Sequence, residues 1–122
     1  MNMGAFSISL AVKDIAASRA FYEKLGLSVM TGDQDQGWLI LKGPTVVIGL
    51  FQGMFDSNIM TFNPGWDADA KEVNPFSDVR EIQAALKATG LVLDSEAQGD
   101  AGPASLTLQD PDGNVILIDQ HR

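Results

Sequence analysis

The sequence contains a single histidine, His121, and an aspartate two residues before it, Asp119. In a β-strand this spacing puts both side chains on the same face. A carboxylate next to an imidazole can act as an acid–base pair or contribute ligands to a metal ion. No nucleophile and no oxyanion-binding group accompanies the pair, and we expect His121 to be mobile in solvent near the end of the chain. We therefore assign no catalytic residue and no metal ligand here.

Cysteine is absent, which rules out disulfides, thiolate metal sites and cysteine nucleophiles. Sixteen acidic side chains against eight basic ones give a formal net charge of −8. This charge repels phosphate backbones, so we expect no nucleic-acid partner. Solubility alone accounts for the acidity, and a cationic ligand is the alternative explanation.

The composition is that of an ordinary globular protein, with 45% hydrophobic and 20% charged residues in a chain of 122. This length suits one domain. No apolar run approaches the length of a membrane span, and the first residues lack the basic and apolar segments of a secretory signal. We expect a soluble cytoplasmic protein with no membrane partner.

Two stretches of the sequence share one pattern of residues: KDIAASRAFYEKLGL at 13–27 and SDVREIQAALKATGL at 77–91. In each, an aspartate is followed twelve residues later by a glycine, the pairs being Asp14 with Gly26 and Asp78 with Gly90. The aspartate can cap the first turn of a helix, and the glycine can end the helix in the left-handed conformation. Apolar residues at three- and four-residue steps between them predict one amphipathic helix in each half of the chain.

Strand signals surround each predicted helix as short runs rich in β-branched and aromatic residues. They cover residues 6–12, 27–30, 37–43 and 45–53 in the first half, and 58–63, 91–94, 104–109 and 114–120 in the second. In each half of the chain the predicted elements follow the order βαβββ. We therefore predict an α+β fold in which two modules, about 1–55 and 56–122, form one domain with a curved mixed sheet and helices on its outer face. The inserted segment 63–78 is either a functional lid or a disordered loop.

Alternation along the predicted strands separates an apolar face from a small, polar one. We expect the apolar set to meet the helices: Ile8, Leu10, Val12, Val46, Ile48, Leu50, Leu106, Leu108, Ile116 and Ile118. The other face carries small and polar residues, with aromatic side chains contributed by Trp38, Phe51 and Phe62. It is either a solvated sheet surface or the wall of a ligand cleft.

Two motifs, VKDIAASRAFYEKLGL near the start and LQDPDGNVILI near the end, resemble signatures of the vicinal oxygen chelate superfamily. That superfamily includes glyoxalase I, bleomycin-resistance proteins, fosfomycin-resistance proteins and extradiol dioxygenases. The resemblance implies the doubled βαβββ fold and a homodimer. For the enzymes of the family it also implies a divalent metal, held in the cleft by His, Glu or Gln side chains from four strands.

The residues at those four ligand positions do not suit a divalent metal. The resemblance places the positions at Ser7, at Gly49 or Leu50, at Asn58 or Ile59, and at Leu117. A hydroxyl, a glycine and a leucine offer neither an imidazole nor a carboxylate, and an asparagine would be a weak lone ligand. We therefore predict no metal site and no cofactor.

We expect a metal-independent protein that binds a small molecule in the cleft of the sheet, as the resemblance to bleomycin-resistance proteins implies. The candidate ligand-binding residues are Ser7, Ser9, Trp38, Gly49, Phe51, Phe62, Trp66, Leu117 and Asp119. Trp66 stands in a Pro/Gly-containing loop without a helix to pack against, so its ring can stack on a ligand.

The alternative is a lyase-type enzyme, glyoxalase-like or dioxygenase-like, with an altered site or one shared across a dimer. Whether the protein is an enzyme is left open. A non-catalytic partner domain is a third reading, which requires a large exposed apolar patch that the sequence does not show.

Overall fold

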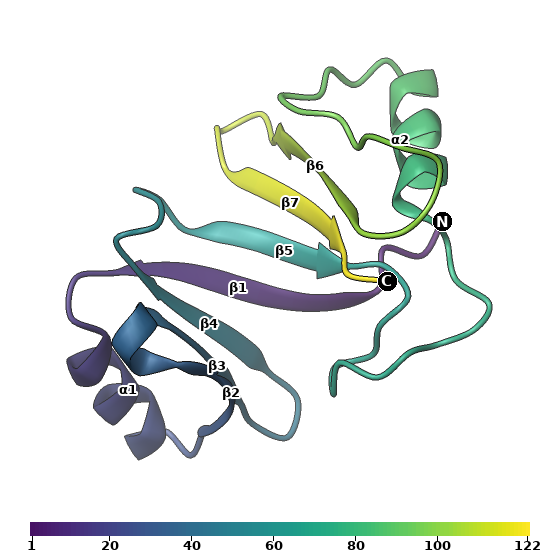
Figure 1. The fold of residues 1–122 in the computed structure, drawn as a ribbon. Helices are drawn as coiled ribbons and strands as arrows, with labels where there is room; N and C mark the ends of the chain where they lie inside the picture. The colour runs from purple at the N-terminus through teal and green to yellow at the C-terminus, as the bar shows by residue number, and fades with distance from the viewer. The chain divides into compact units, whose positions relative to one another are not determined.

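A computed structural model describes residues 1–122 and contains seven β-strands and two α-helices (Figure 1). The predicted α+β class is confirmed. The chain divides into two compact units, which are described separately below. The first unit comprises Ser7–Ile59, and the second comprises Met1–Phe6 together with Met60–Arg122. Neither helix is long and apolar enough to cross a membrane.

The first unit has the predicted βαβββ order. Its elements are β1 (Ala5–Val12, whose first two residues belong to the second unit), α1 (Ile15–Lys24), β2 (Ser28–Asp33), a short 3₁₀-helix (Gln34–Gln36), β3 (Trp38–Lys42) and β4 (Val47–Gln52). The strands lie in the order β2-β3-β4-β1. β1 pairs with β4 in parallel, and the other two pairs are antiparallel, so the sheet is mixed.

The second unit contains β5 (Ile59–Asn63, whose first residue belongs to the first unit), α2 (Val79–Ala88), β6 (Ala104–Gln109) and β7 (Val115–Gln120). β6 and β7 form a regular antiparallel pair. The strand predicted at 91–94 is not formed. Leu91 and Val92 stay exposed, at 48% and 86%, and the backbone reaches β6 only where Asp94 and Ser95 bond Thr107. A single bridge therefore stands where the repeat predicted a strand.

Both helices begin at the predicted aspartates. The Asp14 carboxylate accepts a hydrogen bond from the backbone N–H of Ala17 at 3.1 Å, and the Asp78 carboxylate accepts one from that of Arg80 at 2.8 Å. These bonds satisfy first-turn amides that have no partner within the helix.

Both helices also end in the same way. Gly26 and Gly90 adopt positive φ angles of 98° and 90°. The residue after each glycine donates its N–H back to the helix, Leu27 to Tyr22 and Leu91 to Leu86, both at 3.3 Å. This arrangement is a Schellman motif, and it needs a left-handed residue at the glycine position.

Each unit has its own hydrophobic core between its helix and the apolar face of its strands. In the first unit the buried core residues are Ile15, Leu39, Leu41 and Leu50, with Leu10, Val12 and Ile48 packed against them. In the second unit they are Val79, Ile82, Ala97, Leu106, Leu108 and Ile118, with Ile116 packed against them. The predicted apolar faces of β1, β4, β6 and β7 are thus the faces that pack on the helices. Val46 is the exception, because it lies before β4 and is 47% exposed.

Candidate functional site

Four of the candidate residues come together on the face of the first unit's sheet that points away from α1. Ser9 of β1 pairs in register with Gly49 of β4, and Phe51 of β4 pairs with Trp38 of β3. Their strand neighbours Leu10, Leu39 and Leu50 are on the opposite, α1-facing side. We call the group Ser9, Trp38, Gly49 and Phe51, together with Phe55, the aromatic face.

Gly49 gives the aromatic face its shape. A Cβ atom at this position would lie 2.5 Å from Cε2 of Phe51, so the Phe51 ring occupies the space that any larger residue at position 49 would need. The Phe51 ring in turn packs against Phe55 with 5.3 Å between the ring centroids and 45° between the ring planes. Phe55 was not among the residues predicted from the sequence, because it lies beyond the end of β4, where strand alternation gives no information.

The residues at the positions where enzymes of the resembled family bind a metal are not suited to binding one in this structure. Gly49 has no donor atom and is covered by Phe51, while Leu50, the alternative at that position, is fully buried in the α1 core. The Asn58 side-chain oxygen accepts the backbone N–H of Ala11 at 3.0 Å, so it has a structural partner. Within neither unit do three or more His, Cys, Asp or Glu side chains gather as a metal site requires.

Leu117 and Asp119 lie on the face of β7 that points away from the α2 core, opposite Thr107 and Ser105 of β6. The second unit therefore also has a polar sheet face, as predicted. Phe62 lies elsewhere. Its ring packs against the α2 core and against Phe6, with 5.1 Å between the ring centroids.

His121 is held in place, contrary to the expectation that it is mobile. Its Nε2 lies 3.2 Å from Oδ2 of Asp119, and its ring stacks on Trp66 with 4.7 Å between centroids and 13° between planes. The hydrogen bond to Asp119 raises the pKa of His121 above its usual value, although partial burial acts in the opposite direction. The Trp66 ring, expected to be available for a ligand, thus already has one stacking partner within the protein.

The 63–78 loop is held by the last residue of the chain. The Arg122 guanidinium donates to the carbonyls of Gly65 and Val73 at 3.2 and 3.1 Å and lies 4.1 Å from the centre of the Phe76 ring. It also donates to the Asn74 side chain at 2.9 Å. These contacts connect both ends and the middle of the loop to Arg122.

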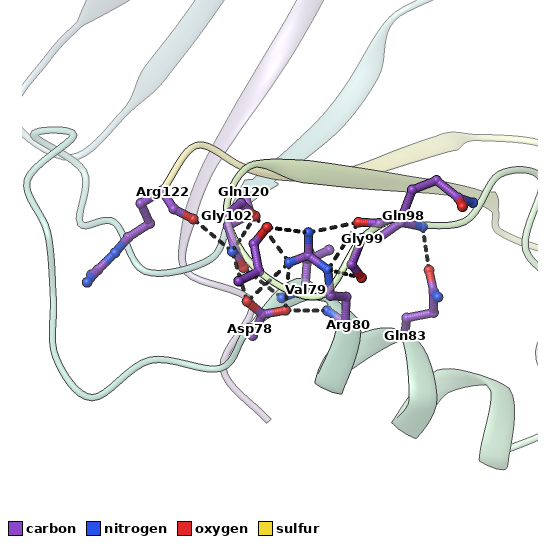
Figure 2. A network of polar contacts seen from close by, with 11 residues as sticks. Asp78, Val79, Arg80, Gln83, Gln98, Gly99, Gly102, Gln120 and Arg122 are labelled. Atoms are coloured by element: carbon purple, nitrogen blue, oxygen red, sulfur yellow. Dashed lines mark hydrogen bonds and ion pairs between the residues drawn. The ribbon is translucent and has the colours of Figure 1, made fainter.

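A network of polar contacts joins α2 to the end of β7 (Figure 2). Gln120 is fully buried, and its side-chain amide bonds Val79, Asp78, Gly102 and Arg122. Burial alone would raise the pKa of Asp78, but hydrogen bonds from Gln120 and Arg80 outweigh it and lower that pKa.

Arg80 completes this network by donating to the backbone carbonyls of Gln98, Gly99, Ala101 and Gly102 (Figure 2). The amide of Gln120 bonds through both its oxygen and its nitrogen, and the Arg80 guanidinium bonds through all three of its nitrogens. The network therefore acts as a structural connection and not as a ligand site.

Solved structures with the same fold are similar to this chain. A structure described as an NAD-dependent benzaldehyde dehydrogenase from Legionella pneumophila matches with a TM-score of 0.70 at 16% identity, covering 96% of this chain and 99% of that one. A glyoxalase/bleomycin resistance protein/dioxygenase superfamily member from Vibrio splendidus 12B01 matches with a TM-score of 0.64 at 18% identity, covering 94% and 97%.

An extradiol ring-cleaving dioxygenase from B. fuscum also matches, with a TM-score of 0.57 at 22% identity, over 94% of this chain and 31% of that one. At these identities the likeness concerns the fold alone. No curated protein sequence matches the chain. The model of the family described as the Glyoxalase/Bleomycin resistance protein/Dioxygenase superfamily matches residues 4–118. The chain therefore belongs to the glyoxalase/bleomycin resistance protein/dioxygenase superfamily.

Proposed function

We propose that this protein binds a small planar molecule on the aromatic face, without a divalent metal at the positions used by the family's enzymes. The observation that supports the proposal most directly is the position that the resemblance places at Gly49 or Leu50. Gly49 supplies no ligand atom and is covered by the ring of Phe51, and Leu50 is fully buried and apolar. Either residue leaves an apolar position where the family's enzymes have a metal ligand.

The chemistry of the aromatic face favours a flat, unsaturated ligand. Trp38 and Phe51 are register partners on adjacent strands, and both are half-buried, so their rings have area left for another molecule. Aromatic pairs contribute about 0.5–1.5 kcal/mol beyond the area that they bury. Ser9, on the same face, is 7% exposed and already has a partner within the protein, so the proposal depends on the aromatic rings.

Fluorescence can test the proposal because each unit contains one of the two tryptophans, Trp38 and Trp66. In a Trp66→Phe variant, emission reports on the aromatic face alone. We expect single-ring and fused-ring aromatic compounds to change Trp38 emission, and we expect Phe51→Ala to weaken their binding about tenfold. Val92→Ala, at a side chain of the second unit that is 86% exposed, is the control.

Measuring the metal content tests the second part of the proposal, that binding does not require a divalent metal. We expect untagged protein purified without chelator to carry no stoichiometric divalent ion by elemental mass spectrometry, and we expect ligand binding to be unchanged by EDTA. A stoichiometric ion, or binding that EDTA abolishes, would contradict the proposal and favour an enzyme of the glyoxalase or dioxygenase type.

A second candidate function is acid–base catalysis of a lyase type by Asp119 and His121. It is supported by their 3.2 Å contact and by the stacking of His121 on Trp66. An imidazole whose pKa is raised within a fixed pair suits proton transfer near neutral pH. Loss of turnover in His121→Gln, with ligand binding at the aromatic face unchanged, is the result that would favour this candidate.

We also propose that the protein forms a homodimer. Phe21 of α1 and Leu25, the residue that follows the end of this helix, are 58% and 63% exposed. Exposed apolar pairs of this kind are often covered by a partner. Light scattering should give twice the chain mass of 13.1 kDa, and Phe21→Ser should reduce it toward the monomer value.

A further inference from the structure

The second unit contains a hollow of about 290 Å³ between the 63–78 loop and the N-terminal segment. The loop lines it with Trp66, Asp67, Val73 and Phe76, and the N-terminal segment lines it with Asn2 and Gly4. No lining residue belongs to the first unit, so this hollow is not part of the aromatic face. Its volume is at the lower end for ligand pockets, which suits a molecule with one ring.

The walls of the hollow are fixed by hydrogen bonds between its two sides and within the loop. The backbone N–H of Ala5 donates to the carbonyl of Trp66 at 3.0 Å, and that of Val73 donates to Gly65 at 2.9 Å. Arg122 also holds the loop through the carbonyls of Gly65 and Val73. A fixed hollow does not have to be ordered by its ligand, which reduces the entropic cost of binding.

Asp67 supplies the one ionisable side chain among the residues that line the hollow. Backbone N–H groups of the lining residues are already bonded within the protein at Gly4, Ala5, Trp66, Asp67 and Val73. The Asp67 carboxylate accepts the amides of Asp69 and Lys71 through Oδ1 alone, at 2.9 and 3.0 Å. Its second oxygen is not used by these bonds. The nearby guanidinium of Arg122 is engaged by Glu72, Asn74 and backbone carbonyls.

From this arrangement we infer that the hollow is a second small-molecule site, which takes a single-ring organic amine in its protonated form. Trp66, Val73 and Phe76 contact the ring, and Asp67 accepts hydrogen bonds from the ammonium group. Apolar walls with one carboxylate select for a cation over a neutral or anionic molecule of the same shape. The net charge of −8 favours the approach of such a cation. This inference does not depend on the proposed function of the aromatic face.

The test uses three probes of similar shape and different charge: phenethylamine, 2-phenylethanol and phenylacetate. The 122-residue chain is titrated at fixed pH while the two indole N–H signals are followed by ¹⁵N NMR and assigned with Trp38→Phe and Trp66→Phe. We expect phenethylamine to shift the Trp66 signal and to bind about fivefold more tightly than the alcohol, which is the upper range for a solvent-exposed ion pair. Phenylacetate should bind most weakly.

Asp67→Asn separates the charge from the structure of the loop, because the asparagine oxygen can still accept the amides of Asp69 and Lys71. We expect this variant to lose the preference for the amine while keeping the native spectrum. Asp112→Asn, in the turn between β6 and β7, makes the same change in net charge outside the hollow and should keep the preference. The inference is overturned by equal affinity for the three probes, by an unchanged preference in Asp67→Asn, or by an absence of Trp66 shifts at millimolar probe.

Discussion

Gln52 and Gln120 occupy equivalent places in the two repeats. Each ends the last strand of its unit, and each accepts the backbone N–H of the first helical residue through its side-chain oxygen. The distance is 2.8 Å from Ile15 to Gln52 and 2.7 Å from Val79 to Gln120. The repeat therefore includes a side-chain bond from strand to helix as well as the helix caps. The two glutamines differ in environment, since Gln52 is exposed and Gln120 is 1% exposed.

This difference predicts unequal costs for the same substitution. Gln120→Ala leaves the buried Val79 amide without its partner and removes one hydrogen bond from the partly buried Asp78 carboxylate, which should lower the free energy of unfolding by about 2–3 kcal/mol. Gln52→Ala lets water replace the lost bond, so its cost should be about 1 kcal/mol or less. Urea denaturation of both variants measures the difference, and equal costs would contradict the assignment of Gln120 to a buried network.

Arg80→Lys should destabilise the protein although the charge is kept. The planar guanidinium of Arg80 reaches four carbonyls of the 98–102 loop together with Asp78, and a lysine cannot reproduce this fork. We expect a loss of about 1–2 kcal/mol, in the range of bonds to charged groups.

Arg19→Lys is the control for that experiment. Arg19 lies on α1 with 39% of its side chain exposed and contacts Glu23 and Gln34. Exposed pairs of this kind contribute little, so the expected change is under about 0.5 kcal/mol. Similar urea midpoints for the two variants would show that the loop carbonyls do not depend on Arg80.

The sequence predicts the helices well because their determinants are local. Asp14 and Gly26, or Asp78 and Gly90, are close in the chain, and a cap or a left-handed glycine acts on its own helix end. The α+β class and the apolar strand faces follow from residue periodicity in the same way.

The side-chain contacts of the candidate site could not be predicted because they join distant parts of the chain. The stack of Trp66 on His121 spans 55 positions, and the bond from Gln120 to Val79 spans 41. Neither has a local signal. The strand predicted at 91–94 failed for a related reason, because the β propensity of Leu91 and Val92 does not determine whether they pair with β6, which the backbone reaches only at Asp94 and Ser95.

The emission of Trp66 should titrate with His121. In a Trp38→Phe variant, Trp66 is the only tryptophan, and a protonated imidazole stacked on its ring should quench it more than a neutral one. The midpoint should lie above 6.5, because the bond to Asp119 raises the pKa of His121. Asp119→Asn should lower the midpoint, and His121→Gln should remove the titration. A midpoint that Asp119→Asn leaves unchanged would mean that this carboxylate does not set it.

The raised pKa of His121 also predicts how the stability of the protein changes with pH. The folded protein binds the His121 proton more tightly than the unfolded chain, so this contribution is complete below pH 6.5 and is lost as the pH rises through the folded-state pKa. The wild type minus His121→Gln difference in unfolding free energy should therefore fall with rising pH. A difference that is constant or rises with pH is the contrary result.

Gly49→Ala tests whether Phe51 fills the place of a side chain at position 49. The new methyl group would meet the Phe51 ring edge at 2.5 Å, so the ring has to move, and overpacking of this kind typically costs about 1–3 kcal/mol. In a Phe51→Ala background that contact is absent, and the substitution should be neutral or stabilising, because glycine weakens a strand interior. Urea denaturation of the four proteins in this double-mutant cycle gives the coupling directly. The same cost in both backgrounds would mean that the strain arises elsewhere, for example at Ile40, whose side chain is 3.4 Å from the same point.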